Sequence, residues 1–558
     1  MRSTGRSALR NTDVVVAGSG PAGLATALFL AEQGVDCYLL GGQRERVRPP
    51  RILGVHPRAM ELLRSLGVEA AVRDLPSTRA LAGNSGIISM ESLAGLELGS
   101  LDAKYVVDVD TDLGSLSPTT WCLCEEAELE QALRERAERL GVRLRPDAEL
   151  VSFEREGWGD EGILAVVRDR ATGEEHRVRA CCLVDAGGTG GVVRERLGVA
   201  FDGRTLGHFV TVRFTADLTG ELRGRRFVMA YVDNPGVRGS LMPLDNRADW
   251  LLHVRHDPER EPAESFTEER CTELVRAATG VAGLTPRIES VSSWAGEAGV
   301  AERFADGPVF LVGDAAHVMP PSGGFDAGTG IIDAHNLAWK LVAVLDGWAH
   351  PDLLDTYDEE RRPVCAATAE QAVLRARDRA RLLAAYPDPA DPELVPDPLV
   401  WLSSRYRSSA VTPWDEGTLP GYGLWAAEND GRPGSRAPHL RLRHGGAEIS
   451  VHDLFGRSMV LLTGPDNLPW REAVRSVAAE LGAPFQVYGV GTDLEDLDDR
   501  WPELYGVTAQ GAVLVRPDGV VAWRCTEAPI FTRTVLRGIT KRVLRLDRRP
   551  AEKEKRTP

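Results

Sequence analysis

The chain has 558 residues, of which 43% are hydrophobic and 27% are charged, as in ordinary soluble globular proteins. This length is too great for a single hydrophobic core and predicts two to four domains. The formal net charge of −16 argues against nucleic acid or an anionic membrane surface as a partner, because both would repel the protein.

A glycine-rich turn follows the first predicted strand. The elements in order are a strand at 13–17, the turn Gly18-Ser-Gly20-Pro-Ala-Gly23, a helix at 24–33 that ends at Gly34, and a strand at 35–40. Glycines at the first turn of such a β-α-β unit let backbone N–H groups approach a pyrophosphate at the helix N-terminus. The pattern predicts a dinucleotide-binding site.

The middle of the chain predicts a second sheet. A helix at 125–141 precedes strand-like segments at 150–168 and 176–184, and further strand-like runs at 209–214, 227–232 and 250–254 are separated by Pro and Gly turns. These last runs are typical of an antiparallel sheet inserted into the first domain, where it could form a wall of a substrate pocket. Met242, Pro243 and Trp250 fall on this sheet and are candidates to line the pocket, with core packing as the alternative.

The last third of the chain returns to an α/β pattern twice. A buried strand at 309–312 leads into Gly313-Asp314-Ala315-Ala316-His317, a glycine-rich loop and a helix at 331–345. Residues 376–440 are rich in Pro, Arg and Asp and have the character of a linker. Beyond them we predict strands at 459–462, 486–490, 512–516 and 520–523 and a helix at 470–481, with a hairpin turn at Pro517-Asp518-Gly519.

Signals for export, membrane insertion and metal binding are not recognisable in the sequence. The longest apolar stretch, 14–31, is interrupted by glycines and a proline, and the start lacks the pattern of a signal peptide. The eight cysteines have neither metal-binding nor Cys-x-x-Cys spacing. We therefore expect a cytoplasmic protein with reduced thiols, no metal site and no disulfide exchange in its tail domain.

These motifs occur in the order of a known family. The glycine turn, the 313–317 segment, Pro320-Pro321-Ser-Gly323-Gly324 and the segments 333–341 and 359–363 resemble the single-component FAD-dependent aromatic hydroxylases related to para-hydroxybenzoate hydroxylase. The likeness runs from about 12 to 375. The tail, with its segments 514–519 and 522–524, resembles the thioredoxin-like extension of the phenol and polyketide hydroxylase branch.

The resemblance implies an α/β fold with three domains. It has a Rossmann-like FAD-binding domain, an inserted antiparallel-sheet substrate domain and a C-terminal thioredoxin-like domain. The expected boundaries are 12–75, 115–200 and 300–375 for FAD binding, 76–114 and 201–299 for substrate, 376–440 for a linker or helical region, 441–545 for the thioredoxin-like domain and 546–558 for a disordered tail.

The resemblance also implies the reaction. Such an enzyme uses NADPH or NADH and O2, through a flavin C4a-hydroperoxide, to hydroxylate a polycyclic aromatic (polyketide-type) or phenolic substrate. The resemblance also implies a role in antibiotic or other natural-product biosynthesis. The flavin supplies the reactivity, and the protein supplies position and electrostatics. We expect a monomer or homodimer. A Baeyer–Villiger oxygenase, or a scaffold with altered or lost flavin chemistry acting as an isomerase, cyclase or binding subunit, remains an alternative.

Site residues follow from the matched positions. Asp314 matches the carboxylate that holds the ribityl chain, and Asp326 is the candidate acid–base group, with loop capping as its alternative. Pro320 joins the substrate-pocket candidates. The residues expected to bind the cofactor are Gly18, Gly20, Pro21, Ala22, Gly23, Arg51, Glu126, Gly313, Asp314, Pro321, Gly323, Gly324, Ala327, Gly328 and Thr329.

Three glycines depart from the family pattern where side chains usually contact FAD. Gly41 stands where an acid binds the adenosine ribose, Gly187 where an aspartate precedes glycine, and Gly328 where an asparagine faces the flavin. Each missing hydrogen bond could weaken FAD binding by about 1 kcal/mol. Asp185 and Asp326 are candidates to compensate for these losses.

Overall fold

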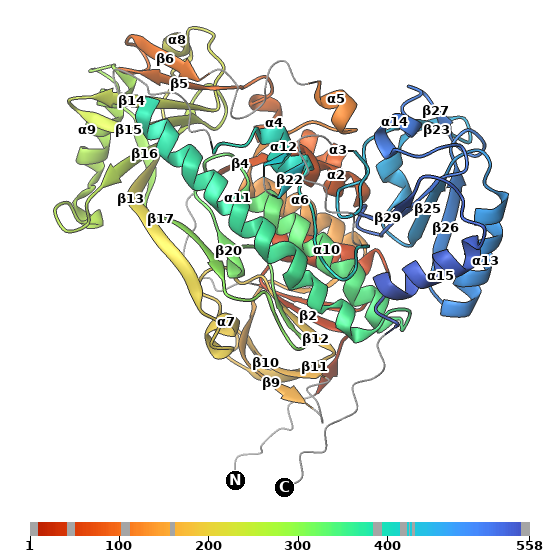
Figure 1. Ribbon diagram of the computed structural model, residues 1–558. Coiled ribbons are helices and arrows are strands. Elements are labelled where there is room, and N and C mark those ends of the chain that lie inside the picture. Colours follow the sequence, from red (N-terminus) through yellow and green to blue (C-terminus); the bar gives the residue numbers. More distant parts are fainter. Residues whose placement is uncertain are drawn as a thin grey trace, which may run out of the picture.

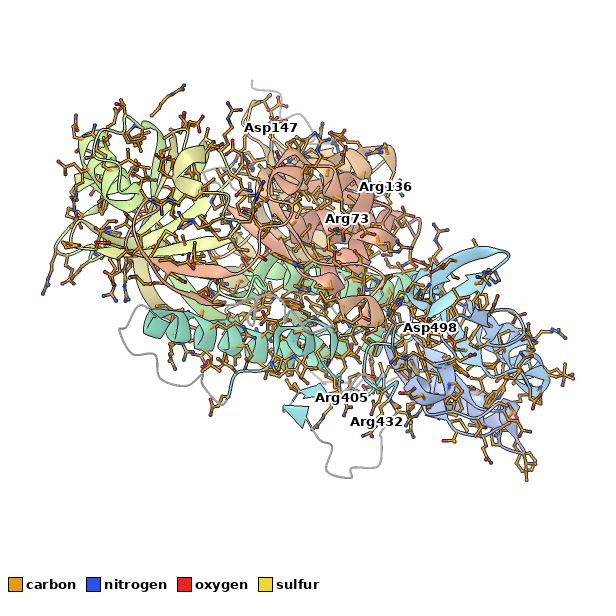
Figure 2. The ribbon with its side chains drawn as sticks, turned by 90° about the horizontal axis from the view of Figure 1, so that it is seen from above. Arg73, Arg136, Asp147, Arg405, Arg432 and Asp498 are labelled. Atoms are coloured by element: carbon orange, nitrogen blue, oxygen red, sulfur yellow. The ribbon has the colours of Figure 1, made fainter. Side chains whose placement is uncertain are left out.

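The computed structural model describes residues 9–41, 51–101, 112–156, 162–382, 393–412, 421–422, 424–426 and 430–547. Three lobes lie side by side, with the C-terminal lobe at one end (Figure 1). The two long helices α10 (Asp326–Leu345) and α11 (Asp355–Leu382) cross the centre. The view from above shows the same row of lobes, with Arg405 and Arg432 near the C-terminal lobe (Figure 2). Most of the expected tail, from 548 onward, lies outside the described residues.

The central lobe is built on a six-stranded sheet of order β18-β19-β12-β2-β3-β8. All neighbouring strands pair in parallel except β18 and β19. The strands are β2 (Val14–Ala17), β3 (Cys37–Leu40), β8 (Arg143–Arg145), β12 (Cys182–Asp185), β18 (Ala305–Asp306) and β19 (Val309–Leu311). Because β2 and β3 are joined by helix α1 (Pro21–Ala31), the lobe begins with the expected right-handed crossover unit of a Rossmann-like fold.

Helices and a small sheet complete this lobe. The helix α10 (Asp326–Leu345) packs on α1, and α6 (Glu126–Arg139) packs on the same helix. A four-stranded sheet lies below (Figure 1) and consists of β1 (Arg10–Asn11), β9 (Ala148–Glu156), β10 (Gly162–Asp169) and β11 (Glu175–Ala180). The two-stranded antiparallel ribbon of β4 (Ile52–Val55) and β7 (Cys122–Glu125) contacts the second lobe through Ile52.

The second lobe is an eight-stranded sheet of order β20-β17-β13-β16-β15-β14-β5-β6. Helix α9 (Glu268–Thr279) covers one face, where Val212, Trp250 and Leu274 form a buried core. The strands are β5 (Ile87–Met90), β6 (Glu97–Leu101), β13 (Phe201–Thr215), β14 (Met229–Asn234), β15 (Val237–Pro243), β16 (Asp249–His256), β17 (Arg287–Ala301) and β20 (His317–Val318). Since β20 directly follows the 313–315 turn, this sheet is joined to the central lobe by a paired strand.

The C-terminal lobe has a thioredoxin-like core. Its sheet has the order β26-β25-β28-β29, with β25 and β26 parallel and the others antiparallel. The strands are β25 (Met459–Thr463), β26 (Phe485–Gly489), β28 (Ala512–Val515) and β29 (Val521–Cys525), and helices α13 (Leu468–Leu481) and α15 (Thr532–Val543) pack together on the sheet.

The long helix α11 and several shorter elements connect these parts. They are α2 (Pro57–Ser65), α3 (Glu69–Arg73), α4 (Pro76–Ala80), α5 (Leu113–Leu116), α7 (Val192–Arg196), α8 (Thr219–Leu222), α11 (Asp355–Leu382), α12 (Asp397–Leu402), α14 (Trp501–Tyr505), β21 (Gly421–Tyr422), β22 (Trp425–Ala426), β23 (Arg441–His444), β24 (Ala447–Ser450) and β27 (Glu495–Asp496). Four of them lie wholly or partly in the region expected to be a linker: α11, which extends to Leu382, α12, which packs beside α2, and the paired strands β21 and β22.

The turn between β28 and β29 inserts into the central lobe. Arg516 and Asp518 are both buried there. Arg516 Nη2 donates to Glu360 Oε2 at 2.8 Å, and Lys340 Nζ donates to the same oxygen at 2.9 Å. Asn336 Nδ2 bridges Glu360 and Asp518, at 2.8 and 3.1 Å. We call these five residues the interlobe network; it fastens the C-terminal lobe to α10 and α11.

Candidate functional site

Three segments that are far apart in the sequence meet at the N-termini of α1 and α10. A Cβ atom added to Gly313 would lie 2.9 Å from Cβ of Ala22 and 3.9 Å from Cα of Gly330. A Cβ atom added to Gly330 would lie 3.0 Å from the same Ala22 atom. Side chains larger than hydrogen would therefore separate the three backbones, and the glycines bring the predicted motifs into one site.

The turn before α1 is shaped for a phosphate group. Gly18 has a φ of +119°, and a Cβ atom on Gly23 would lie 1.9 Å from the carbonyl oxygen of Gly18. Gly20 caps the helix without a side chain, and Pro21 occupies its first turn. The first N–H groups of α1 are therefore free of a side-chain cap, and the positive end of the helix dipole favours an anion at this point.

A cluster of charged side chains lies beside the N-terminus of α10. Arg51 makes a two-pronged hydrogen bond to buried Glu126, with Nε–Oε2 at 2.8 Å and Nη2–Oε1 at 2.7 Å. The third guanidinium nitrogen, Nη1, is 3.7 Å from Oδ2 of Asp326. Asp314 is close enough to affect both Arg51 and Asp326. We call these four residues the cleft cluster.

Asp326 has an unusual protonation equilibrium within this cluster. Burial and the neighbouring charge of Asp314 raise the pKa of the Asp326 carboxyl to about 7, although Arg51 and His317 oppose the shift. A carboxyl that titrates near neutral pH can both accept and release a proton under physiological conditions. The helix N-terminus alone would have lowered this pKa, so burial and the neighbouring Asp314 charge outweigh its effect.

The loop before α10 lies against the two-stranded ribbon of β4 and β7. Gly323 and Gly324 have φ values of +95° and +65°, and a Cβ atom on Gly324 would lie 3.4 Å from the carbonyl oxygen of Gly54. Pro320 and Thr329 are buried, Pro321 is exposed and Ala327 is half-buried. Pro321 and Ala327 thus keep surface that a ligand could contact.

The helix α10 begins at Asp326, five residues before the predicted start at 331. The glycines at 328 and 330 suggested a loop, but they lie in the first helical turns. Gly328 is required by its neighbour, because a Cβ atom there would lie 2.2 Å from Nε2 of His56. His56 therefore fills the space that a side chain at 328 would occupy, and it caps α2 by accepting from the Ala59 N–H.

The other two departures also have local causes. A Cβ atom on Gly41 would lie 2.0 Å from the carbonyl oxygen of Pro146, so no acidic side chain fits that position without a backbone shift. A Cβ atom on Gly187 would lie 3.0 Å from Oδ1 of Asp185, which accepts from the Gly187 N–H at 2.9 Å. Asp185 is buried, and burial raises its pKa to about 6. By accepting the Gly187 N–H, the Asp185 carboxylate holds the turn that follows β12.

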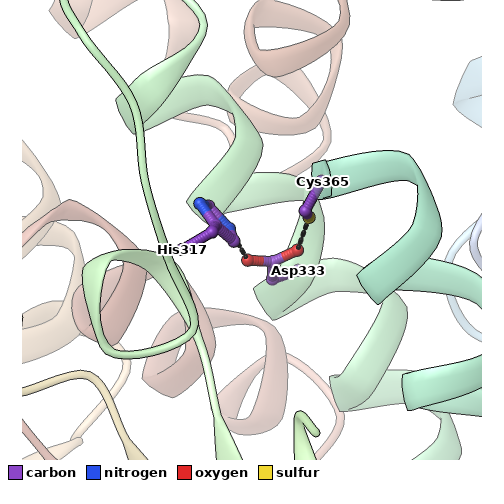
Figure 3. A group of neighbouring side chains, drawn as sticks. All are labelled: His317, Asp333 and Cys365. Atoms are coloured by element: carbon purple, nitrogen blue, oxygen red, sulfur yellow. Dashed lines mark hydrogen bonds and ion pairs between the residues drawn. The ribbon is translucent and has the colours of Figure 1, made fainter. Parts of the chain in front are cut away.

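Behind the cleft, a fully buried group of side chains holds the 313–317 segment (Figure 3). His317 Nε2 lies 2.7 Å from Asp333 Oδ2, and the Gly313 N–H donates to the same oxygen at 3.2 Å. Arg361 Nε donates to Asp333 Oδ1 at 2.7 Å, and Cys365 Sγ lies 3.6 Å from that oxygen.

The charges of this group disfavour a bound metal cation. Burial opposes protonation of His317, but Cys365 and Asp333 raise its pKa well above the usual value. His317 and Arg361 are then two cations beside one Asp333 carboxylate, and a metal cation added among them would be repelled. The group is best explained as an ion pair that orders the loop carrying Asp314.

The face of the eight-stranded sheet opposite α9 lies toward the cleft. Met242, Leu244 and Leu251 form a small apolar cluster against Ile52, which follows Arg51. Met242 and Pro243 are buried, and Met242 belongs to this cluster. Trp250 instead lies in the core under α9, with Nε1 donating to the Ala216 carbonyl at 3.3 Å. Its position favours the packing alternative.

Sequence reasoning missed the residues that neighbour Trp250 on the cleft side. Successive side chains of a strand point to opposite faces, so the predicted strand at 250–254 already separated Leu251 and His253 from Trp250. The buried pattern decides which face is the core: Trp250, Leu252 and Val254 belong to the cluster under α9. Period-two alternation was the signal that could have identified the cleft-facing residues.

The residues present fit FAD. The uncapped turn before α1 suits a pyrophosphate, the close approach of Ala22, Gly313 and Gly330 leaves backbone surface for a flat ligand, and acidic and basic side chains adjoin it. Asp314 is partly exposed at this point, where a carboxylate can accept hydrogen bonds from hydroxyl groups.

Comparisons with known proteins agree with this geometry. Residues 11–372 match the FAD binding domain family, and residues 430–545 match the family of aromatic-ring hydroxylase C-terminal domains. The chain is 40% identical to 4-methyl-5-nitrocatechol 5-monooxygenase of a Burkholderia species, covering 92% of this chain and 93% of that protein. It is 38% identical to tetracenomycin A2 monooxygenase-dioxygenase of Streptomyces glaucescens, covering 95% and 96%.

A solved structure is also similar over almost the whole chain. It is the ternary complex of aklavinone-11 hydroxylase with FAD and aklavinone, with a TM-score of 0.87 and 36% identity, covering 96% of this chain and 99% of that one. Within the described residues, none of the helices has the length and apolar character needed to cross a bilayer.

Proposed function

Because this chain belongs to the FAD-dependent aromatic-ring hydroxylases, we propose that it hydroxylates a polycyclic, polyketide-type aromatic compound in natural-product biosynthesis, with NADPH or NADH as the electron donor. The protein is an FAD-dependent monooxygenase, as the sequence predicted. The relatives differ in substrate, since one acts by its name on a nitrocatechol and another on tetracenomycin A2. The polycyclic class is the one that the structural neighbour with aklavinone supports.

One observation carries the proposal. The cleft cluster, with its titratable Asp326, adjoins both the glycine-lined FAD site and the apolar cluster of Ile52, Met242 and Leu251. A flat aromatic ring suits the apolar side, and a phenolic proton needs an acceptor at its edge. We therefore propose that the cofactor, the apolar cluster and the acid–base group contact the same substrate.

Each residue of the cleft cluster has a proposed task. Bound FAD supplies the oxygen-transfer chemistry, because the flavin can activate O2 after reduction. Asp326 Oδ2 accepts the proton released by the substrate or returns one to it. Arg51, fixed by Glu126, holds positive charge beside the ring and keeps Asp326 partly ionised. Asp314 binds hydroxyl groups of the cofactor.

The first experiment measures cofactor binding and substrate-dependent turnover. Purified protein is titrated with FAD, and NAD(P)H oxidation and O2 uptake are followed with 2-naphthol and with a hydroxylated anthraquinone. We expect a flavin absorbance spectrum and oxidation that these aromatics accelerate, with a hydroxylated product in mass spectrometry. A protein that binds FAD but forms only a ring-expanded ester would support Baeyer–Villiger chemistry, and one that binds no FAD would contradict the proposal.

Two further parts of the proposal concern the setting of the enzyme. Flavin reduction draws on NAD(P)H, so we propose that the enzyme acts in the cytoplasm, where this reductant is regenerated. We also propose a monomer or homodimer, which light scattering of the FAD-loaded protein would distinguish.

A further inference from the structure

Three polar side chains form a hydrogen-bonded row on the cleft-facing side of the eight-stranded sheet. Thr211 is in β13, His253 in β16 and Trp294 in β17, and these three strands are neighbours. Trp294 Nε1 donates to Thr211 Oγ1 at 2.9 Å, and Thr211 Oγ1 lies 2.7 Å from His253 Nδ1. Trp294 also stacks on Phe209, with ring centroids 4.7 Å apart.

The hydrogen bonds fix which nitrogen of His253 carries a hydrogen. An indole N–H can only donate, so Thr211 Oγ1 accepts from Trp294. Among the described residues, His253 Nδ1 is the one acceptor within hydrogen-bond distance of the Thr211 hydroxyl, so we assign the hydroxyl hydrogen to that nitrogen. Burial lowers the pKa of His253 to about 4, so its imidazole is neutral at physiological pH. A neutral imidazole that accepts at Nδ1 bears its hydrogen on Nε2.

The Nε2–H group is the open end of this row. Among the residues that the structure describes, no hydrogen-bond acceptor is found for it, whereas Nδ1, the Thr211 hydroxyl and the indole N–H are all engaged. A donor held by two further side chains and left without an acceptor has a fixed direction. Such an arrangement suits recognition of an oxygen atom on a ligand.

The row has cofactor-site residues at one side. Leu251 lies two residues before His253 on the same face of β16, and it packs with Met242 and Ile52. Ile52 follows Arg51, whose guanidinium reaches Asp326. The apolar wall of the proposed aromatic site therefore continues directly into His253.

Strand β17 connects the row to the loop before α10. Strand β17 continues from Trp294 to Gly299, which pairs with Val318 of β20. β20 runs antiparallel to β17 and leads straight into Pro320 and the glycine loop. Trp294 therefore lies on the strand that pairs with the segment leading into the loop before α10.

We propose that His253 Nε2 donates a hydrogen bond to an oxygen substituent of the aromatic substrate, such as a phenolic oxygen or a quinone carbonyl. This inference rests on the proposed function and names the feature of the substrate that the site selects. His253 is the substrate-binding residue, and Thr211 and Trp294 are positioning residues that hold its tautomer and direction. A site built to donate to an oxygen discriminates against the same ring without that oxygen.

The experiment compares 2-naphthol with naphthalene. Dissociation constants for both probes are measured from the perturbation of flavin absorbance in the oxidised, FAD-loaded enzyme. We expect the wild type to bind 2-naphthol about tenfold more tightly, as one neutral hydrogen bond of about 1.4 kcal/mol would give. His253→Phe should bind both probes equally.

A second readout isolates the hydrogen bond from packing. The pKa of bound 2-naphthol is measured by difference absorbance of the naphtholate, because donation from Nε2 stabilises the anion. His253→Phe should raise this pKa. Thr211→Val, which keeps the shape but removes the hydroxyl, should move it in the same direction, and Thr211→Ser should restore it.

The matched control is His256→Phe. His256 is in the same strand on the opposite face, where Nδ1 lies 2.9 Å from the Glu261 carbonyl oxygen and the ring contacts Phe266. This variant should keep the wild-type preference. The inference is overturned if His253→Phe keeps the preference, or if the wild type has none. Failure of the proposed function is a different result, namely no FAD binding or no aromatic-stimulated NAD(P)H oxidation.

Discussion

Helix α10 takes part in two charged clusters that differ in how their charges are balanced. Near its middle, Asn336 and Lys340 belong to the interlobe network, where Arg516 and Lys340 face Glu360 and Asp518. At its N-terminus, Asp326 belongs to the cleft cluster, where three carboxyl groups share one described guanidinium, that of Arg51. The first set is neutral overall, and the second has a surplus of acids.

The difference explains which cluster can do chemistry. In the interlobe network every carboxylate has cationic and amide donors, so the pKa of Glu360 stays below its usual value despite burial. In the cleft cluster, burial and the neighbouring charge of Asp314 raise the pKa of Asp326 to about 7, and Arg51 offsets them only in part. A buried and fully paired network stabilises one arrangement, whereas an unbalanced cluster holds a proton that can leave at neutral pH.

The largest effect is expected from breaking the neutral network. Arg516→Met leaves Glu360 and Asp518 without their shared cation, so the free energy of unfolding should fall by about 3–5 kcal/mol. Urea unfolding followed by tryptophan fluorescence measures this change. The control is Arg533→Met, which removes an exposed pair with Glu480 and should change stability by less than about 0.5 kcal/mol. Similar losses for both variants would contradict the role of the network.

The next effect concerns the proton of the cleft cluster. Asp326→Asn should lower turnover at pH 8 by about a hundredfold and remove the limb of the pH–rate profile near pH 7. Asp346→Asn, at the other end of α10, is the matched control and should keep both. An unchanged profile in Asp326→Asn would assign the limb to another group.

Stability gives the same carboxyl an independent readout. Its pKa rises from 3.8 to about 7 on folding, so between these values the native state binds more protons than the unfolded state. The Asp326 contribution to stability therefore falls as pH rises through this window, and the loss is complete above about pH 7. Asp326→Asn should lose less stability than the wild type between pH 5 and pH 8 in thermal unfolding.

A smaller effect tests why the cleft has glycine at 328. Gly328→Asn restores a side chain at that position but meets His56, so it should destabilise the protein by about 1–3 kcal/mol. His56→Ala should cost about 1 kcal/mol, since the cap of α2 is lost. If the two side chains compete for one space, the double variant should be more stable than the sum of the single losses predicts. Thermal unfolding with and without FAD measures all three.

The smallest effect is expected at the thiol of the C-terminal lobe. Burial raises the pKa of Cys525, and its thiol lies against the Glu527 carbonyl, so the reactive thiolate is disfavoured. Cys525→Ser should leave turnover and stability nearly unchanged, within about 0.5 kcal/mol. Loss of activity, or sensitivity of the wild type to thiol reagents at this residue, would contradict a purely structural lobe.

The sequence predicted much of this architecture, because its strongest signals are local. The turn at Gly18–Gly23 and the 313–317 segment carried the cofactor, fold and family predictions, which the comparisons confirm. Contacts between distant segments were not visible in the same way. The effect of His56 on Gly328 joins α2 to α10, and the interlobe network joins residues from Asn336 to Asp518; neither pair has a sequence spacing that marks it.

The start of α10 and the position of Trp250 show a second reason why the sequence predictions differ from the structure. The glycines at 328 and 330 made the first turns of α10 look like a loop, because glycine has a low helix propensity. Close packing against Ala22 and His56 outweighs that propensity in the structure. Trp250 was a pocket candidate as an aromatic residue on the inserted sheet, with core packing as the alternative, and alternation along β16 places it under α9. Residue type suggested the chemistry, and only the pairing of strands showed which side it faces.

The two-residue strand β20 links motions of the two lobes. It hydrogen-bonds to β17 in the substrate sheet, and its neighbours on either side are the Asp314 turn and the proline–glycine loop. Ordering that loop around a cofactor should therefore slow amide hydrogen exchange in β17 as well. Cofactor binding and the rigidity of the substrate sheet would then be thermodynamically linked. The substrate sheet would be most rigid when the cofactor is bound.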